Sequence, residues 1–528
     1  MSDMRRAARR RRPFLLLVLV LVLVAGAGTV AWRLLLGGEE KDARASAVDA
    51  FLTAWASGDA AAAGRATSDP AGASARLGAL AKDLPGTRFE LRRGEREGER
   101  FAFRVTLHLK GGDRFAYDSS APVVRTGDAW RVTWSPAVIH PRLTDGSKLA
   151  VTTGSRRAEI LSADGSPLGG LAPALVGAPG TSGLNYRYEK RLAGRPASSV
   201  AIVGTSTGRT LATLHTSKGT GGSPVRTTLD IPTQKAAEAA LRGLSKNAAI
   251  VAIRPSTGEI VAAADNPPTG TNRALRGQYP PGSDFKVVTA AALIGGGMST
   301  STPTPCPKYE TVNGQRFENQ DLFELPAGAT FADDFAHSCN TGIIALRDRL
   351  TPSSLTETAK AFGIGQSWDV GAVTFDGSVP VTTSANDQAA AMIGQGRVQA
   401  SPLVMASVAA TVKDGTFRQP VLVPDAVKQR AEAPLRLEPA VASQLRTLMR
   451  AVVTEGSGKA LRGMAGEPGA KTGTAEYGDA SPPRTHAWFI GYRGDLAFAV
   501  LIEDGGSGGK DAGPVAAEFL KGAGERQR

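Results

Sequence analysis

Apolar residues follow first a helical and then a strand-like spacing in the opening third of the chain. Residues 47–63 are rich in alanine and carry large apolar side chains at helical intervals, which predicts a helix. Between Phe101 and Leu109 every second residue is apolar, as in a strand with one buried face. Lys110–Asp113 forms a turn into a second strand near Phe115, and alternation returns at 130–134. We therefore expect a small α+β domain at residues 40–148, with a helix against a curved antiparallel sheet.

The pattern changes after residue 148 and again at residue 225. Residues 149–224 are rich in Gly, Ser, Thr and Pro, which is typical of short strands and loops in a linker domain. Beyond them we expect a helix at 232–244, hairpins at 248–264 and 486–503, and a last helix at 513–522. About 220 mostly helical residues separate the hairpins. Strands at both ends of a domain predict one antiparallel sheet with helices on its faces, an α+β fold over residues 225–528.

The N-terminus has the pattern of a membrane anchor. Six arginines lie within residues 1–12, and the uncharged stretch from Pro13 to Trp32 is, at ~1.5 Å per residue, long enough to cross a bilayer. We predict a transmembrane helix at residues 13–36, with a cytoplasmic basic tail at 1–12 and the rest of the chain outside the cell membrane. A cleaved signal peptide is the alternative, because Ala25-Gly26-Ala27 resembles a cleavage site.

Charge, cysteine and histidine content narrow the functional classes. The formal net charge is +13, and the first twelve residues, with six Arg and Asp3, account for +5 of it. No dense basic run with aromatics indicates nucleic-acid binding. The five histidines are dispersed without metal-ligand spacing, so we expect no metal and no cofactor. Cys306 and Cys339 can form one disulfide outside the membrane or remain two buried thiols, and the sequence leaves both open.

The first candidate for chemistry is Ser283 within Pro280-Pro281-Gly282-Ser283-Asp284-Phe285-Lys286. Pro-Pro-Gly prevents helix before Ser283, and Gly295-Gly296-Gly297 ends the helix that follows. Ser283 is thus expected at a helix N-terminus, where free N–H groups favour developing negative charge. Lys286 lies three residues on, hence on the same face. A desolvated lysine there can act as base towards the serine, although Ser-x-x-Lys alone is a weak motif.

Two later strings strengthen this interpretation. Ser338-Cys339-Asn340 lies between helical stretches, where a loop can present a hydroxyl and an amide. Lys471-Thr472-Gly473-Thr474 opens a strand whose edge can pair with a peptide backbone while its cation and hydroxyls hold a carboxylate. Each string alone also fits a plain polar loop or an exposed strand. In this order, however, the three correspond to the motif set of penicillin-binding proteins and β-lactamases, with Ser-Cys-Asn in place of Ser-Asp-Asn.

With these motifs the chain resembles the class B penicillin-binding proteins over residues 225–525. Further strings agree with that family, namely Thr227–Asp230 with Gln234, Gly394-Gln395-Gly396 followed by Ser401-Pro402-Leu403, Gly469–Glu476 and Ala487–Gly491. Residues 40–148 resemble the NTF2-like N-terminal domain of the MecA type, with an exit near His140–Leu143. The family's pedestal or dimerisation domain is represented in 149–224 by fragments only, which indicates a shortened version.

The resemblance implies a peptidoglycan D,D-transpeptidase that cross-links stem peptides ending in D-Ala-D-Ala and is acylated by β-lactams. Ser283 would be the nucleophile and Lys286 its base, with Ser338 as proton relay and Lys471 tuning it. Asn340 would hold the donor's side amide and contact Lys286. Thr472, Gly473 and Thr474 would bind the substrate, and the backbone N–H groups of Ser283 and Thr474 would form the oxyanion hole.

The same motifs also occur in proteins with other functions. A D,D-carboxypeptidase would use the same residues, and a β-lactam sensor or a scaffold of the division machinery is a second alternative. A β-lactamase is disfavoured because no Glu-x-x-Leu-Asn string supplies a deacylating water. The expected partners are stem peptides, β-lactams, the membrane and other proteins of cell-wall synthesis.

Overall fold

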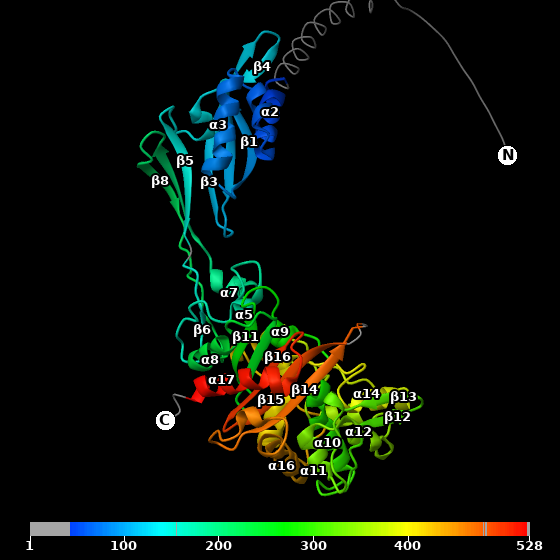
Figure 1. Cartoon of the computed structure of the whole chain (residues 1–528). Coiled ribbons are helices and arrows are strands. Elements are labelled where there is room, and N and C mark those ends of the chain that lie inside the picture. Colours follow the sequence, from blue (N-terminus) through cyan, green and yellow to red (C-terminus); the bar gives the residue numbers. More distant parts are fainter. Residues whose placement is uncertain (1–42, 155, 479, 481–482, 525–528) are drawn as a thin grey trace, which may run out of the picture. The chain divides into compact units, whose positions relative to one another are not determined.

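The computed structural model describes residues 43–154, 156–478, 480 and 483–524, and these divide into two compact units (Figure 1). The first unit comprises Met1–Arg157 with Ala193–Gly222, and the second comprises Ala158–Leu192 with Ser223–Arg528. The predicted tail at 1–12 and anchor at 13–36 lie outside the described residues. No helix among the residues that are described is long and apolar enough to cross a membrane.

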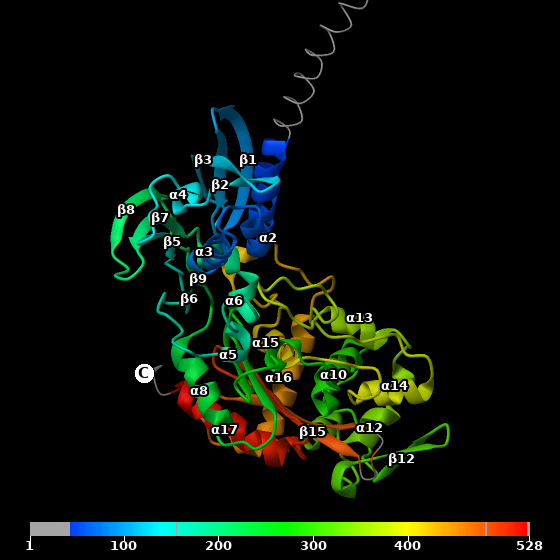
Figure 2. The same ribbon diagram turned by 90° about the horizontal axis from the view of Figure 1, so that it is seen from above.

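The first unit packs helices against an antiparallel sheet, as predicted. Its helices are 43–57, α2 (Ala60–Arg65), α3 (Pro70–Asp83) and α4 (Pro136–Ile139). The sheet has the order β1-β2-β3-β4, with β1 (Arg88–Glu97), β2 (Arg100–His108), β3 (Arg114–Thr126) and β4 (Ala129–Val132). Alternate residues of β2 are buried, and Phe103 meets Trp55 of the first helix edge to face at 6.1 Å. Figure 2 shows α2 and α3 beside these strands.

The helix predicted at 47–63 is in fact two helices. Gly58 adopts φ +81°, a left-handed conformation that glycine takes without strain and that ends the first helix. Asp59 then caps α2, because its carboxylate accepts a hydrogen bond from Ala62 N at 2.8 Å. The sequence did not indicate this break, because the alanines on both sides of Gly58 favour a helix.

The linker domain predicted at 149–224 does not form a unit of its own. Strands β5 (Ser147–Gly154), β7 (Ala197–Gly204) and β8 (Thr210–Thr216) make a three-stranded antiparallel sheet in the first unit. Leu149, Val200 and Ile202 on this sheet join the apolar core of that unit. Residues 158–192 instead pack with the second unit, where Leu175, Leu184 and Leu192 enter the other core. The segment is thus divided, because its apolar residues are buried in two different cores.

The second unit is built on one five-stranded sheet of order β11-β10-β16-β15-β14. Its strands are β10 (Ala248–Ile253), β11 (Ile260–Asn266), β14 (Gly469–Tyr477), β15 (Arg484–Arg493) and β16 (Leu496–Ile502), all antiparallel. Because β10 pairs with β16, the sheet joins both ends of the domain, which confirms the predicted architecture. β14 is an edge strand, with β15 on one side only.

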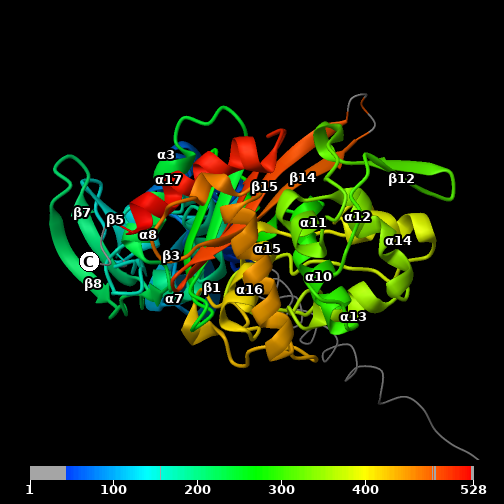
Figure 3. The same cartoon turned by 60° about the horizontal axis from the view of Figure 1, so that its bottom comes forward.

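Helices cover both faces of this sheet (Figure 3). On one face lie α8 (Ile231–Leu241) and α17 (Gly513–Gly524), and on the other α15 (Pro402–Asp414) and α16 (Pro439–Thr454). A group of further helices packs next to α16, with α10 and α11 in contact with it. The group comprises α10 (Lys286–Gly295), α11 (Phe331–His337), α12 (Asn340–Ala345), α13 (Ser354–Lys360) and α14 (Ala385–Met392). The hairpin of β12 (Tyr309–Val312) and β13 (Gln315–Glu318) contacts α12.

Short elements complete the second unit. They are β6 (Ile160–Leu161), β9 (Val225–Arg226), α5 (Pro173–Val176), α6 (Gly183–Arg187), α7 (Glu189–Ala193) and α9 (Arg273–Arg276). β6 and β9 pair in parallel and bring the chain to α8. Every residue of β10 is buried, which explains why this strand is apolar throughout and does not alternate.

Candidate active site

Ser283 lies in a 3₁₀ turn, Gly282–Phe285, that leads directly into α10. The predicted helix start is therefore displaced by one turn, and the α-helix itself begins at Lys286. The entry to the turn is held by two hydrogen bonds, because Gly282 N donates to Gly394 O at 2.9 Å and Trp488 Nε1 donates to Pro280 O at 3.1 Å. Ser283 is almost completely buried, with 9% of the residue exposed.

Lys286 is completely buried, and its ammonium contacts the loop that carries Ser338 and Asn340. Nζ donates to Asn340 Oδ1 at 2.6 Å, to Ser338 O at 2.8 Å and to Cys339 O at 3.0 Å, and it lies 3.5 Å from Ser338 Oγ. These three short contacts occupy all three protons of an ammonium. A neutral Lys286 would keep at most two of them and would have a lone pair free to accept a proton.

The Ser338 loop joins two helices end to end. Ser338 is the C-cap of α11 and has φ +64°, while Asn340 is the first residue of α12. A left-handed serine is uncommon and costs on the order of 1–3 kcal/mol where the surroundings impose it, so this geometry is enforced by the fold. Asn340 is fixed at both ends of its amide, because Nδ2 also donates to Glu318 O at 3.0 Å.

A disulfide joins Cys306 and Cys339, so the structure has the bond that the sequence left open. Cys339 is the middle residue of the Ser338 loop, which is thereby linked to a segment 33 residues earlier in the chain. The two sulfurs and an oxygen of Asp334 lie within 4.8 Å of one another. Sulfurs bonded to each other are not thiolates and are poor metal ligands.

β14 brings the third motif to the same place. Lys471 is fully buried, and its Nζ donates to Ser338 Oγ at 2.9 Å and to Thr472 O at 2.8 Å. Thr472 Oγ1 lies 2.6 Å from Ser457 Oγ. Thr474 Oγ1 donates to Gln320 Oε1 at 3.1 Å and accepts from Gly508 N at 3.3 Å. Ser338 is therefore the hydroxyl shared by both lysines.

Glycines allow the Ser283 turn to lie directly against β14. A Cβ at Gly473 would be 2.8 Å from Pro281 O, and one at Gly282 would be 2.7 Å from Thr474 O. Contacts this short mean that a side chain at either position would push the turn and the strand apart. The backbone of Thr474 and the Ser283 turn are thus neighbours, as a shared oxyanion hole requires.

Burial lowers the proton affinity of both lysines. Burial holds the pKa of Lys286 well below its ordinary value, and the positive charge of Lys471 adds to this effect, while Asp334 opposes it. Burial also lowers the pKa of Lys471 to about 8, opposed by Asp284. A lysine with a lowered pKa can be neutral near physiological pH, which a base requires.

Three polar residues at the site were not predicted. Asp284 and Asp334 are fully buried, and none of their carboxylate oxygens has a hydrogen-bond partner among the described residues. Burial raises the pKa of Asp284 well above its usual range and that of Asp334 to about 7, and the neighbouring lysines oppose it. Gln320, in the 3₁₀ turn Gln320–Leu322 after β13, is the third. Asp334 lies four residues before Ser338, and on a helix this spacing puts both residues on the same face. The spacing was the feature of the sequence from which Asp334 could have been placed at the site.

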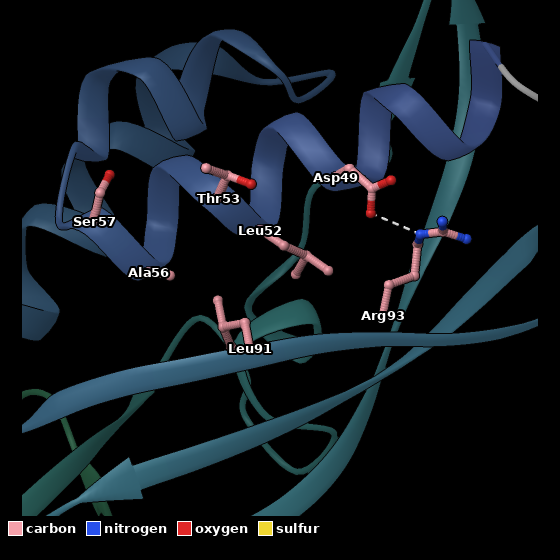
Figure 4. Close-up of a pocket in the computed structure, with 7 residues that line it drawn as sticks. All are labelled: Asp49, Leu52, Thr53, Ala56, Ser57, Leu91 and Arg93. Atoms are coloured by element: carbon pink, nitrogen blue, oxygen red, sulfur yellow. Dashed lines mark hydrogen bonds and ion pairs between the residues drawn. The ribbon is translucent and has the colours of Figure 1, made fainter.

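A hollow of about 420 Å³ in the first unit has none of this chemistry (Figure 4). It lies between the first helix and β1, and Leu52 and Leu91 form part of its wall. Arg93 Nε contacts Asp49 Oδ1 at 2.7 Å at its side, and both groups are partly exposed. None of the predicted catalytic residues lines it.

A serine in a rigid turn, two buried lysines and a strand edge define a serine acyltransferase of the penicillin-recognising class. Comparisons agree with this class. The family model described as penicillin binding protein transpeptidase domain matches residues 248–521, and that of the NTF2-like N-terminal transpeptidase domain matches 43–147. The chain belongs to the penicillin-binding protein transpeptidase family, as a class B member with an NTF2-like N-terminal domain.

Several relatives carry names that bear on function. The peptidoglycan D,D-transpeptidase PbpA of Mycolicibacterium smegmatis is 32% identical over 375 residues, which cover 58% of this chain and 74% of the relative. PbpA of Mycobacterium tuberculosis is 30% identical over 382 residues, covering 60% of this chain and 75% of the relative. The fold resembles a ceftriaxone acyl-enzyme complex of penicillin-binding protein A from M. tuberculosis, with TM-score 0.59 and 24% identity, over 70% of this chain and 98% of that one.

Proposed function

We propose that this protein is a peptidoglycan D,D-transpeptidase that works through an acyl-enzyme on Ser283 and is acylated there by β-lactams. The observation that carries the proposal is the hydrogen bonding of Lys286 and Lys471 to the Ser338 loop, beside a serine turn packed on the edge of β14. The names of the PbpA relatives support the same activity.

In the first half-reaction, neutral Lys286 takes the proton of Ser283, and Oγ attacks the carbonyl carbon of the penultimate D-Ala. The N–H groups of Ser283 and Thr474 hold the resulting oxyanion. The C–N bond then breaks as Ser338, hydrogen-bonded to Lys471, passes its proton to the leaving amine. Ser338 receives in exchange the proton that Lys286 took from Ser283. Terminal D-Ala departs, and an ester remains on Ser283.

In the second half-reaction, an amine of a neighbouring stem peptide attacks the ester carbonyl. Its proton passes to the basic groups of the site, the C–O bond breaks, and Ser283 regains a proton. The new amide is the cross-link. Before D-Ala leaves, Thr472 and Thr474 bind the donor's terminal carboxylate; in both half-reactions Asn340 positions the donor while it holds Lys286.

Labelling with a fluorescent penicillin tests the nucleophile. Wild-type protein should label covalently, and Ser283→Ala should not, with Ser256→Ala as a matched control on an exposed hairpin turn of the same unit. Labelling of Ser283→Ala equal to wild type would refute the assignment.

Product analysis separates transpeptidase from carboxypeptidase. With a D-Ala-D-Ala donor and a labelled D-amino acid as acceptor, a transpeptidase incorporates the label into the donor, whereas a carboxypeptidase only releases D-Ala. Release without incorporation at any acceptor concentration would favour the carboxypeptidase.

The membrane location is part of the same proposal. The uncharged stretch from Pro13 to Trp32 and the arginines before it support a single-pass anchor at 13–36 with the catalytic unit outside. The full chain should sediment with membranes and a chain lacking residues 1–40 should not. Recovery of the full chain in the soluble fraction would contradict the anchor.

A further inference from the structure

The free edge of β14 is blocked at one residue by a side chain from another segment. The amide of Gln395, turned so that both its groups are satisfied, accepts from Glu476 N at 2.9 Å and donates to Glu476 O at 3.2 Å. A side-chain amide that bonds to both backbone groups of one residue imitates the peptide group of a neighbouring strand. Both groups of Glu476 therefore point away from β15.

The alternation of antiparallel strands extends this to the neighbouring residues. If Glu476 faces the open edge, Thr474 and Thr472 do so as well, since backbone direction repeats every second residue. Thr472 O already accepts from Lys471 Nζ at 2.8 Å. Thr472 O is thus occupied by Lys471, and both backbone groups of Glu476 are occupied by Gln395. Of the three residues that face the open edge, Thr474 is the one whose N–H and C=O can both pair with an incoming strand.

Gln395 is held by the same backbone that holds the nucleophile turn. Gly394 has φ +69°, its carbonyl accepts from Gly282 N at 2.9 Å, and a Cβ on it would lie 2.1 Å from Gly282 O. Gln395 N donates to Ala390 O at 2.9 Å at the end of α14. The position of Glu476 relative to Ser283 is thereby fixed through the Gln395 amide and the backbone contact between Gly394 and Gly282.

We propose that Gln395 is a specificity-determining residue that ends the pairing edge of β14 at Glu476 and so limits the acyl donor's backbone to Thr474. The inference rests on the proposed function. A donor with its carboxylate at Thr472 and its scissile carbonyl at Thr474 N runs antiparallel to β14, so its preceding residues run toward Glu476. Gln395 stops pairing there and fixes the register in which the carbonyl meets Ser283.

Two donors of different length test this. One is a D-alanyl thioester with a single N-acyl group, and the other carries two more amino-acid residues before the D-alanyl group. In Gln395→Ala the backbone of Glu476 becomes available, and kcat/KM for the longer donor should rise by roughly tenfold, mainly through KM, as one or two new hydrogen bonds allow. The short donor should change by less than about twofold.

Controls separate this role from a structural one. Gln395→Glu keeps the shape of the side chain but cannot donate to Glu476 O. It should therefore also raise kcat/KM of the longer donor relative to the short donor, but by less than Gln395→Ala. Gln429→Ala, an exposed glutamine of the same unit, should leave both donors unchanged. Thermal unfolding of each variant reports whether the fold persists.

Each result of the experiment decides a different point. Equal losses for both donors, or no change in either, would overturn the inference, because Gln395 would then be structural or irrelevant. A loss confined to the longer donor would overturn it too, since Gln395 would bind the donor instead of ending the edge. If neither donor acylates the wild type, the proposed function fails first and the inference falls with it.

Discussion

The charged groups around Ser283 in the second unit lie in a different environment from the ion pairs of the first unit. In the first unit ion pairs lie at the surface, as in Lys148–Asp83 at 2.5 Å, where the side chains are 35% and 19% exposed. Around Ser283 the charged groups are instead fully buried, with Lys286 and Lys471 near Asp284 and Asp334. Water satisfies the first kind at little cost, whereas burial of the second kind costs several kcal/mol per ion.

The difference in burial determines whether a charged group affects mainly stability or mainly catalysis. Surface pairs contribute roughly 0–1 kcal/mol to stability. Buried lysines acquire a lowered pKa, which makes them useful as bases. We therefore expect substitutions of charge to affect stability slightly in the first unit and acylation strongly in the second.

Replacing one lysine in each unit should give the largest contrast. Lys286→Met removes the base, and the rate of acylation by a fluorescent penicillin should fall by about 10³-fold or more. Lys148→Met should leave the acylation rate unchanged and lower the free energy of unfolding by less than about 1 kcal/mol. Circular dichroism checks that both variants fold. Acylation of Lys286→Met within tenfold of wild type would assign the base elsewhere.

A methyl group at Gly473 should act through geometry alone. Its Cβ would meet Pro281 O at 2.8 Å and Trp488 Cβ at 3.0 Å, so β14 and the Ser283 turn must separate. A shift of about 1 Å between the groups of an oxyanion hole costs about 10²-fold in rate. The acylation rate of Gly473→Ala should therefore be about 10²-fold below that of the wild type. The control is Gly295→Ala, where a Cβ meets nothing within 4 Å. Similar rates in the two variants would contradict the proposed packing.

Sequence reasoning predicted what depends on local pattern. Ser283, Ser338 and Lys471 lie in short motifs, and the paired strands at 248–264 and 486–503 carry uninterrupted apolar runs. The break at Gly58 was missed because the alanines around it suit one long helix. The split of 149–224 between two cores depends on tertiary packing, which periodicity does not reveal.

Part of the site also depends on contacts between distant segments. Gln320 meets Thr474 across 154 residues of sequence, and Gln395 meets Glu476 through its amide. No motif predicts such pairs: Gln320 lies in an ordinary polar segment, and the Gly394-Gln395-Gly396 string resembles the family without showing what Gln395 contacts. Asp284 was visible inside the nucleophile motif, but only the fold shows that its carboxylate is buried.

Loss of the disulfide should affect both stability and rate. Cys306→Ala with Cys339→Ala removes a cross-link that closes a loop of 33 residues, which is worth up to roughly 4 kcal/mol of unfolding free energy. Because Cys339 O accepts from Lys286, a looser loop should also slow acylation, by about tenfold. Urea unfolding and penicillin labelling measure the two effects. Full stability of the double variant would contradict a structural role for the bond.

The smallest effect should come from the carboxylate beside Lys286. Asp334 raises the pKa of Lys286 against the lowering by burial and Lys471, and Asp334→Asn removes that charge. The pKa of Lys286 should then fall further, so its neutral, basic form persists to lower pH. The acidic limb of the acylation rate should shift to lower pH by up to about one unit, as expected for one partly screened charge. Because the pKa of Asp334 is about 7, its negative charge acts on Lys286 fully only above that pH. The control is Asp348→Asn, whose side chain is 90% exposed and should leave the profile in place. A shift to higher pH in Asp334→Asn, or an equal shift in Asp348→Asn, would show that the buried carboxylate does not act on the base.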